Sequence, residues 1–458
     1  MQRVLDAALA SGGEFAELFA EDRRSSGAQL DDGRVEQLSS GRDRGAGIRV
    51  VVGDTTGFAH TAELSEAGLL AAAAAAGSAA RDGGGGTATV ALRRSDTVAS
   101  RRFEVLPESV AKHRKVDLLL RADDAGRSAG AAVTQMTVAY ADARRQILVA
   151  NSDGLLVDDD VVRTSFRVSA VASGDAGMQQ GYENVARTTG FELFDEVEVE
   201  EVARTAAGRA LAKLEARPAP TGPVPVVIKA GRGAVLFHEA CGHGFEADAI
   251  EKRASVFAGR VGQQVASPMV TLVDDGTMAT QWGASAIDDE GAPAARNVLV
   301  QDGMLTDYMW DFLRSRKAGR VSSGNGRRQS YQHLPMVRMT NTYVLAGTED
   351  PDEIVRQTPY GVYVAQINGG QVNTVTGDFV FGMTEAYLIE DGEITHPLRG
   401  ANLIGNGPEV LRGIDAVGSD FAMASGGGTC GKNGQGVPVG MGQPTLRVTA
   451  MTVGGTAA

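Results

Sequence analysis

The sequence predicts an α+β protein of two domains, and three observations support this prediction. The chain has 458 residues, which is too many for one ordinary hydrophobic core. Hydrophobic residues make up 43% of the chain and charged residues 22%, proportions typical of a globular protein. Glycine accounts for 59 of 458 residues, about 13%, and Asp-Gly pairs separate short runs of β-branched residues, as turns between antiparallel strands do.

The first predicted domain begins with a helix, because apolar residues between 4 and 9 repeat at helical spacing. After a glycine pair comes a second helix or a strand. Asp32-Gly33 and Gly53-Asp54 then mark turns between antiparallel strands. An Ala-rich helix is expected over 65–80, with Ser65 as its N-cap and four glycines at 83–86 as the loop that ends it.

The rest of this domain is predicted to contain two more helices and a meander. Residues 107–129 and 196–216 have helical spacing, and between them three alternating strands are split at Asp153-Gly154. The segment that follows contains Pro218, Pro220, Pro223 and Pro225, which is typical of a linker between domains. We therefore predict a mixed α/β amino-terminal domain over 1–216. A mainly antiparallel domain over 217–458 follows, because its Val-rich runs alternate with DDGT, QDGM, NGGQ and EDGE turns.

Charge and cysteine content exclude several classes of protein. The net charge of −13 disfavours nucleic acid or an anionic membrane as a partner. The longest apolar run, 69–80, falls short of the about 18 residues that a membrane-spanning helix needs. Two cysteines are too few for a disulfide framework, so we expect a reducing, cytoplasmic location.

One motif carries the chemistry of the sequence. His238, Glu239 and His243 form an HExxxH pattern in a segment that reads as strand, glycine turn and helix. Residues five apart lie about 140° apart around an ideal helix, so the two imidazoles meet only if the helix distorts. Either a π-bulge forms, or His243 lies beyond the helix end with Gly244 as the cap. The alternative interpretation is a pair of hydrogen-bonded core histidines.

A catalytic zinc normally takes three protein ligands, so a third ligand must come from elsewhere. The candidates are His333, His396, Cys430 and the acidic clusters. Cys430 is favoured because small neighbours in SGGGTCGKNGQGVP leave its thiolate accessible, and Lys432 could help to hold the thiolate charge. Cys241 is interpreted as a small buried hydrophobic residue, with a Cys241–Cys430 disulfide as the alternative.

Three further segments have weaker interpretations. Asp288, Asp289 and Glu290 could face substrate or support the ligands, although an acidic surface turn is the more common use of such a run. Arg327 and Arg328 could clamp a substrate carboxylate or be ordinary salt-bridged residues. Gly369 and Gly370 in INGGQV could offer a strand edge to an extended peptide, or simply form a tight hairpin.

The second half of the chain resembles the TldD/PmbA family of metalloproteases, in particular its TldD branch, which carries an intact zinc motif. The segments that carry the resemblance occur in the family's order: HEACGHGFEAD, IDDEGAPA, GNGRRQSY, VTGDFVFGMTEAYLIEDGEI, ANLIGNGPEVL and GTCGKNGQGVPVGMGQP. In the first half, DDGRVEQ, GAGIRVVVGDTTGFAHT and NSDGLLVDDD are similar to its amino-terminal domain. The resemblance covers nearly the whole chain.

The resemblance implies one Zn²⁺ held by His238, His243 and Cys430, with Glu239 as the general base that hydrolyses peptide bonds. It also implies unfolded peptides as substrates, pairing with an inactive PmbA-type subunit, and roles in peptide-antibiotic maturation and antitoxin turnover. Whether the assembly is a heterodimer or a homodimer is left open. Two alternatives remain: a non-catalytic interaction protein with a structural zinc, and a zinc amidase that acts on a small molecule.

Overall fold

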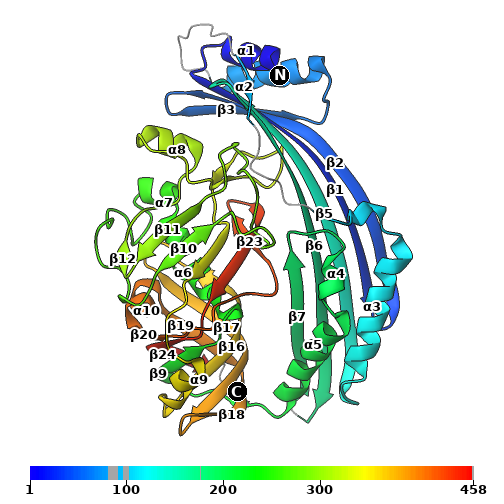
Figure 1. Cartoon of the computed structure of the whole chain (residues 1–458), viewed down its shortest axis with the longest axis vertical. Coiled ribbons are helices and arrows are strands. Elements are labelled where there is room, and N and C mark those ends of the chain that lie inside the picture. The colour runs from blue at the N-terminus through cyan, green and yellow to red at the C-terminus, as the bar shows by residue number, and fades with distance from the viewer. Residues whose placement is uncertain (81–90, 96–102, 176, 456–458) are drawn as a thin grey trace.

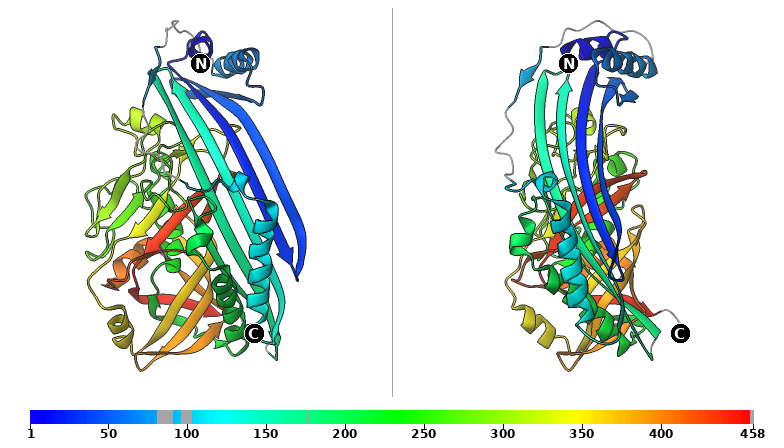
Figure 2. Two further views of the ribbon diagram at one scale, coloured as in Figure 1. Left: turned by 45° about the vertical axis from the view of Figure 1, so that its right-hand side comes forward. Right: turned by 90° about the vertical axis from the view of Figure 1, so that its right-hand side faces the viewer.

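The protein has a mixed α/β fold rich in sheet, seen in a computed structural model that describes residues 1–80, 91–95, 103–175 and 177–455 (Figure 1). The loop expected at 83–86 lies outside the described residues. A tall curved sheet from the first half of the chain stands beside a body formed by the second half (Figure 1), and in the right-hand view of Figure 2 the sheet lies in front of that body. Three larger sheets and one two-stranded sheet are present among the described residues.

The tall sheet has the order β3-β2-β1-β5-β6-β4, with β7 paired to β6. Its strands are β1 (Phe15–Asp31), β2 (Arg34–Val52), β3 (Thr55–Thr61), β4 (Arg93–Arg94), β5 (Val133–Asn151), β6 (Leu155–Gly174) and β7 (Gly177–Arg187). The chain turns between β1 and β2 at Asp32 and Gly33, both with positive φ, as the sequence predicts. Four of these strands have 17 to 20 residues, far longer than the sequence suggests.

Helices cover the sheet at both ends. They are α1 (Gln2–Leu9), α2 (Glu66–Ala79), α3 (Lys112–Arg127), α4 (Leu193–Glu196) and α5 (Val199–Leu214). The predicted cap of α2 is present, since the Ser65 hydroxyl accepts a hydrogen bond from the Gly68 amide at 3.1 Å. α1 and α2 pack in one hydrophobic cluster, and α3 and α5 share a second cluster with β5 and β6. The Gly12 break is followed by a strand and not by a second helix.

The second half holds two further sheets. An eight-stranded sheet has the order β16-β9-β24-β19-β17-β18-β8, with β20 beside β24, and an extra β16–β17 pairing closes five of its strands into a ring. Its strands are β8 (Arg217–Pro218), β9 (Gly222–Ile228), β16 (Tyr360–Val372), β17 (Asp378–Glu390), β18 (Glu393–Arg399), β19 (Ala401–Asn406), β20 (Ile414–Val417) and β24 (Leu446–Gly455). Pairing is mainly antiparallel, although β9 runs parallel to β16.

The remaining sheet has the order β12-β11-β10-β15-β23-β21, with β22 paired to β23. Its strands are β10 (Leu272–Asp275), β11 (Arg296–Gln301), β12 (Met304–Leu305), β15 (Asn341–Val344), β21 (Ala422–Met423), β22 (Gly428–Lys432) and β23 (Gln435–Gln443). A separate pair is β13 (Gly326–Arg327) with β14 (Met336–Val337). The helices here are short: α6 (Val235–Ala240), α7 (Ala247–Glu251), α8 (Phe312–Lys317), α9 (Pro351–Arg356) and α10 (Gly407–Gly413).

A buried network of charged residues joins the two halves, and we call it the junction network. It consists of Glu17, Glu21, Arg49, Arg145, Asp289, Glu290 and Arg328. Arg49 contacts Glu17 at 2.7 Å and Glu290 at 2.8 Å, so its guanidinium connects β2 and β1 to the second half. Beside the network, Phe19 of β1 packs in one apolar cluster with Ile287 and Tyr331.

Candidate metal centre

The segment with the two histidines is a short helix followed by a sharp break. Gly231, with φ of 89°, turns the chain out of β9 and into α6. α6 ends at Ala240, Cys241 leaves the helical conformation at φ −126° and ψ −49°, and 242–245 form a 3₁₀ turn. His243 therefore lies beyond the helix end, which is one of the two arrangements that the spacing allows, and no π-bulge forms. Gly244 is not a left-handed cap; a side chain there would lie 2.7 Å from the Phe257 ring.

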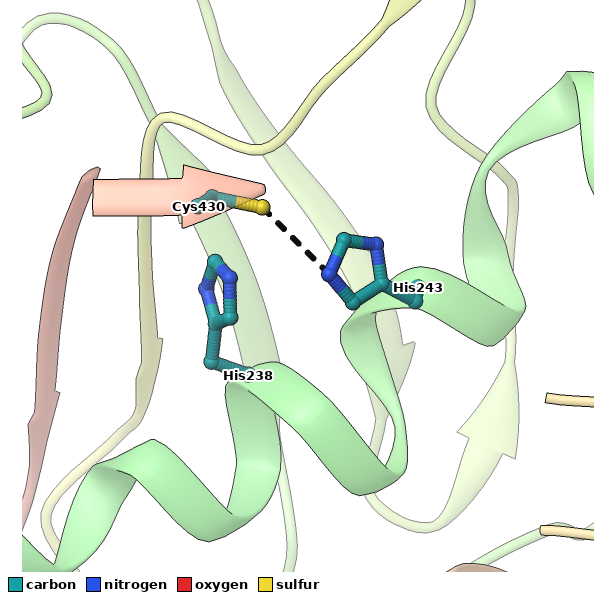
Figure 3. Close-up of side chains that lie close together, drawn as sticks. All are labelled: His238, His243 and Cys430. Atoms are coloured by element: carbon teal, nitrogen blue, oxygen red, sulfur yellow. Dashed lines mark hydrogen bonds between the residues drawn. The ribbon is translucent and has the colours of Figure 1, made fainter. Parts of the chain in front are cut away.

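The side chains of His238, His243 and Cys430 converge on one point (Figure 3). Their donor atoms all lie within 4.8 Å of one another, and Cys430 Sγ is 3.3 Å from His243 Nε2. In a tetrahedral zinc site the corresponding sulfur–nitrogen separation is about 3.6 Å, given the usual Zn–S and Zn–N bond lengths. Cys430 comes from β22, so the site joins α6, the 3₁₀ turn and a strand that follows 187 residues after His243.

His238 has the strongest need for a ligand. Its side chain is 1% exposed, and neither ring nitrogen has a hydrogen-bond partner among the described residues. A buried imidazole without any partner is costly, because the ring loses its bonds to water. A metal ion bound by one of the two nitrogens would remove part of this cost. Two imidazoles and one thiolate are donors that zinc prefers, so the residues fit a zinc ion.

Cys430 is held as a thiolate by its surroundings. Burial alone would raise its pKa, but the neighbouring imidazoles of His238 and His243 lower the pKa of Cys430 to about 4. The strand itself is fixed by Arg338, which donates hydrogen bonds to the backbone carbonyls of Cys430 and of Gln435. Cys241 is different: it lies in the main hydrophobic cluster, and burial raises its pKa. Both cysteines are free, so the disulfide alternative is not realised.

Behind His243 lies a layer of charged residues that the sequence interpretation missed. Glu246 accepts a hydrogen bond from His243 Nδ1 at 3.0 Å, and Lys432 contacts Glu246 at 2.8 Å and Asp248 at 2.7 Å. Although burial opposes it, the charges of His243 and Lys432 lower the pKa of Glu246 to about 2. The Glu246 bond fixes the orientation of the ring, so that Nε2 faces Cys430. Lys432 thus acts through Glu246, and not on the thiolate as expected; only the spacing of three between His243 and Glu246 could have indicated this.

Glu239 lies at the rim of the cluster. Its side chain is 25% exposed, and a carboxylate oxygen is 3.7 Å from His243 Nε2. A carboxylate that touches both solvent and the donor cluster can exchange protons with a water molecule held there. The geometry therefore places a carboxylate beside the three candidate metal donors.

The other candidate ligands lie elsewhere. Among the residues that the structure describes, His238, His243 and Cys430 form the one cluster with metal-ligand geometry. The His333 ring contacts the Ser330 hydroxyl at 2.9 Å, and His396 lies on β18. The acidic run is not a surface turn: Asp288, Asp289 and Glu290 are all at most 5% exposed. Asp289 and Glu290 belong to the junction network, and Asp288 accepts the amides of Gly326, Glu290 and Ala292.

The two arginines have different surroundings. Arg328 is buried in the junction network and pairs with Glu17, which favours a structural role. Arg327 is 5% exposed, donates to the carbonyls of Met339 and Pro438, and lines a cavity of about 460 Å³ between the tall sheet and the β22–β23 hairpin. Burial lowers the pKa of Arg327 to about 10. Gly369 and Gly370 lie exposed on β16, in a stretch that pairs with β17.

Comparison with known proteins places the chain among the PmbA/TldA metallopeptidases. The models for the PmbA/TldA metallopeptidases match the chain with domain 1 over 16–80, the central domain over 106–214 and the C-terminal domain over 221–455. The chain belongs to the PmbA/TldD family, so the resemblance seen in the sequence is confirmed.

Relatives carry names that support a protease. The "Metalloprotease TldD homolog" of Haemophilus influenzae is 39% identical over 449 residues, covering 97% of this chain and 93% of that protein. A "Metalloprotease" of Methanothermobacter thermautotrophicus is 36% identical and covers 97% of this chain and 96% of its own length.

Two solved structures share the fold. A putative modulator of a DNA gyrase from Thermotoga maritima has a TM-score of 0.82 at 21% identity, covering 99% of this chain and 98% of its own. TldE from Thermococcus kodakarensis has a TM-score of 0.79 at 19% identity, and the match covers 99% of this chain and 100% of the TldE chain. No helix in the described part of the chain is long and apolar enough to cross a membrane.

Proposed function

We propose that the chain is a zinc-dependent peptidase whose one Zn²⁺ is held by His238, His243 and Cys430. The observation that carries this proposal is the convergence of these three donors within 4.8 Å, with the Glu239 carboxylate 3.7 Å from His243 Nε2. A catalytic zinc site has three protein ligands and an open position, whereas a structural site is closed by four.

A zinc ion held by His238, His243 and Cys430 would supply Lewis acidity, which would polarise the scissile carbonyl and make the attacking water more acidic. Glu239 takes a proton from that water and delivers it to the leaving amine, so the carboxylate ends the cycle unchanged. Glu246 keeps the His243 ring in one orientation throughout, and Lys432 keeps Glu246 ionised.

We propose extended, unfolded peptides as substrates. We expect a peptide backbone to approach the exposed segment of β16 around Gly369 and Gly370. β16 also packs against α6, the helix that carries His238. Arg327 is kept as a weaker candidate for a substrate contact, because it is buried but lines a cavity. Arg328 lines the same cavity, but its ion pair with Glu17 makes it a support of the cavity wall and not a substrate contact.

The proposal extends to assembly, location and domains. We propose that the chain pairs with a PmbA-type subunit or with a second copy of itself; a structural neighbour is named TldE, which fits a two-subunit assembly. The net charge of −13 disfavours a nucleic-acid or membrane partner, and the two free cysteines fit the proposed cytoplasmic location. We further propose that the boundary between the two domains lies between residues 216 and 217.

The test measures zinc per chain and cleavage of an unstructured peptide by the same preparation. We expect about one zinc per chain, loss of cleavage after chelation, and recovery with added zinc. Competition by unrelated unstructured peptides separates a peptidase from an amidase that acts on a small molecule, because a small-molecule pocket ignores such peptides. Zinc that is bound tightly without any cleavage, alone or with a PmbA-type subunit, would favour the interaction protein with a structural zinc.

A further inference from the structure

A second cavity, of about 560 Å³, lies between the first half of the chain and the metal-bearing half. Its walls come from β7, α5, the first turn of α6, β16 and β17, and the loop that leads into β22. Its lining includes Lys213, Arg209, Arg232, Val235, Gln366 and Met441.

The cavity adjoins the metal centre through two of these residues. Val235 precedes His238 by three residues on α6, which is about one helical turn. Met441 packs against the apolar cluster that contains Cys430. Gln366 of β16 lines the same wall, just before the exposed glycines of that strand. A peptide extended along β16 from the metal centre would therefore pass this cavity.

The charge of the cavity is opposite to that of the protein. Its lining residues include Arg209, Lys213 and Arg232 and no aspartate or glutamate, although the whole chain has a net charge of −13. Behind the wall, Glu183 pairs with both arginines, and Glu385 pairs with Arg209. Three cations thus meet two carboxylates, which leaves one positive charge.

Lys213 carries that excess charge. Its ammonium donates to the backbone carbonyl of Gln180 at 2.7 Å, and no ion pair is recorded for it with any described carboxylate. The side chain is half-buried. Burial lowers the pKa of Lys213; the attraction of Glu385 opposes this effect, and a smaller repulsion by Arg209 adds to it. A partly desolvated ammonium without a counter-ion gains more from an incoming anion than a surface lysine does.

We propose that this cavity binds a carboxylate of the peptide substrate through Lys213, so that the enzyme prefers peptides with an acidic group a few residues from the scissile bond. The carboxylate is either an Asp or Glu side chain or the carboxyl terminus of the peptide. This inference rests on the proposed peptidase function and adds a substrate class to it.

The test measures binding separately from cleavage. The full chain with Glu239→Gln, loaded with zinc, is titrated with labelled unstructured peptides of ten residues, and the dissociation constant is measured by fluorescence anisotropy. Each peptide contains either one glutamate or one glutamine, and its carboxyl terminus is either free or amidated, which gives four kinds of peptide. The position of the glutamate or glutamine is varied along the peptide. We expect the peptides with a carboxylate to bind about five- to tenfold more tightly than the neutral amidated one, less so at high salt.

Lys213→Met should remove this preference and leave the binding of the neutral peptide unchanged. The matched control is Arg204→Met, which also removes one positive charge from α5. Arg204 lies nine residues before Lys213 and therefore on the opposite, exposed face of the helix. A preference that follows the glutamate identifies a side-chain site, and one that follows the free terminus identifies a terminal-carboxylate site. Equal binding of all four peptides, or an equal loss in both variants, would overturn the inference.

Cleavage of the same peptides by the chain with intact Glu239 tests the proposed function independently. Binding that depends on Lys213 without cleavage of any peptide upholds the carboxylate site and argues against a peptidase. Cleavage of all peptides at the same kcat/KM, with no effect of Lys213→Met, upholds the peptidase and overturns the carboxylate site.

Discussion

Two buried polar clusters in this protein meet the cost of burial in opposite ways. In the junction network, each of four carboxylates meets an arginine of the same chain; Arg49, for example, contacts both Glu17 and Glu290. In the metal centre, His238 has no partner for either ring nitrogen among the described atoms, and Cys430 has a pKa of about 4. The carboxylates of the network thus have cationic partners within the chain, although Arg49 Nε and Arg328 Nε lack a hydrogen-bond partner among the described residues. In the candidate metal centre the whole His238 ring lacks one, which a bound cation would supply. This contrast separates a cluster built for stability from one built for chemistry.

The largest expected effect follows from removing the proposed zinc ligand Cys430. Cys430→Ala should reduce zinc from about one per chain to near zero and abolish hydrolysis, because only two of three ligands remain. Elemental analysis measures the metal. Cys241→Ala is the matched control: that thiol lies in the hydrophobic cluster, so this variant should keep its zinc. Equal zinc in both variants would mean that Cys430 is not a ligand.

The next largest effect is expected from replacing Glu239, the proposed general base. Glu239→Gln should lower kcat by about 10²- to 10⁴-fold while zinc stays bound, because the amide cannot accept the proton from water. Steady-state kinetics on an unstructured peptide measures the loss. Glu251→Gln on the nearby α7 is the control, since that side chain is 50% exposed and away from the cluster. Wild-type activity in the Glu239 variant would exclude the mechanism.

A substitution in the junction network should lower the stability of the fold but leave the zinc content unchanged. Glu17→Gln leaves Arg49 and Arg328 short of a counter-ion, and breaking a buried ion pair from one side costs about 3–5 kcal/mol. Thermal unfolding should show a lower midpoint, with zinc per folded chain unchanged. The exposed Glu14 offers a control in Glu14→Gln. A midpoint equal to that of the control would remove the network's role in stability.

The smallest effect is a pH dependence of stability. Burial, together with the charges of Asp311 and Glu17 and against that of Arg49, raises the pKa of Glu290 to about 7 from an ordinary value of 4.5. The folded state then binds more protons than the unfolded state between these values, so Glu290 reduces stability as pH rises from about 4.5 to about 7. The reduction reaches at most about 3 kcal/mol.

Glu290→Gln mimics the protonated acid, so it should flatten the dependence of the unfolding free energy on pH in this window. Denaturant titrations at several pH values measure the slope, with Glu251→Gln as the control. A slope as steep as that of the wild type would show that another group is responsible.

Part of this molecule was predictable from its sequence because the signals are local. The Ala-rich helix with its Ser65 cap and the turn at Asp32-Gly33 follow from short-range propensity. The lengths of the strands were not predictable. The segment 34–44 of β2 is exposed throughout and rich in polar residues, and it is held in the strand by pairing with β1, a contact that no periodicity reports.

The candidate site shows the same limit. His238, Glu239 and His243 are close in sequence, and the glycine-rich surroundings of Cys430 indicated a third donor. Glu246 and Lys432 were missed or misassigned because their contact spans 186 residues and depends on how β22 docks. The acidic run at Asp288 was wrong as a surface turn, since its burial depends on arginines of the distant tall sheet.

The distance along the chain between the metal donors has a consequence for biosynthesis. Cys430 follows His243 by 187 residues, and a ribosome that adds about 5–20 residues per second needs about 10–40 s to reach it. During that time the nascent chain presents two histidines without the thiolate, next to strand β9, whose neighbour β24 has not yet been made. If the chain binds zinc as proposed, the metal is expected to enter after translation, so that release of the chain from the ribosome precedes loading of the site.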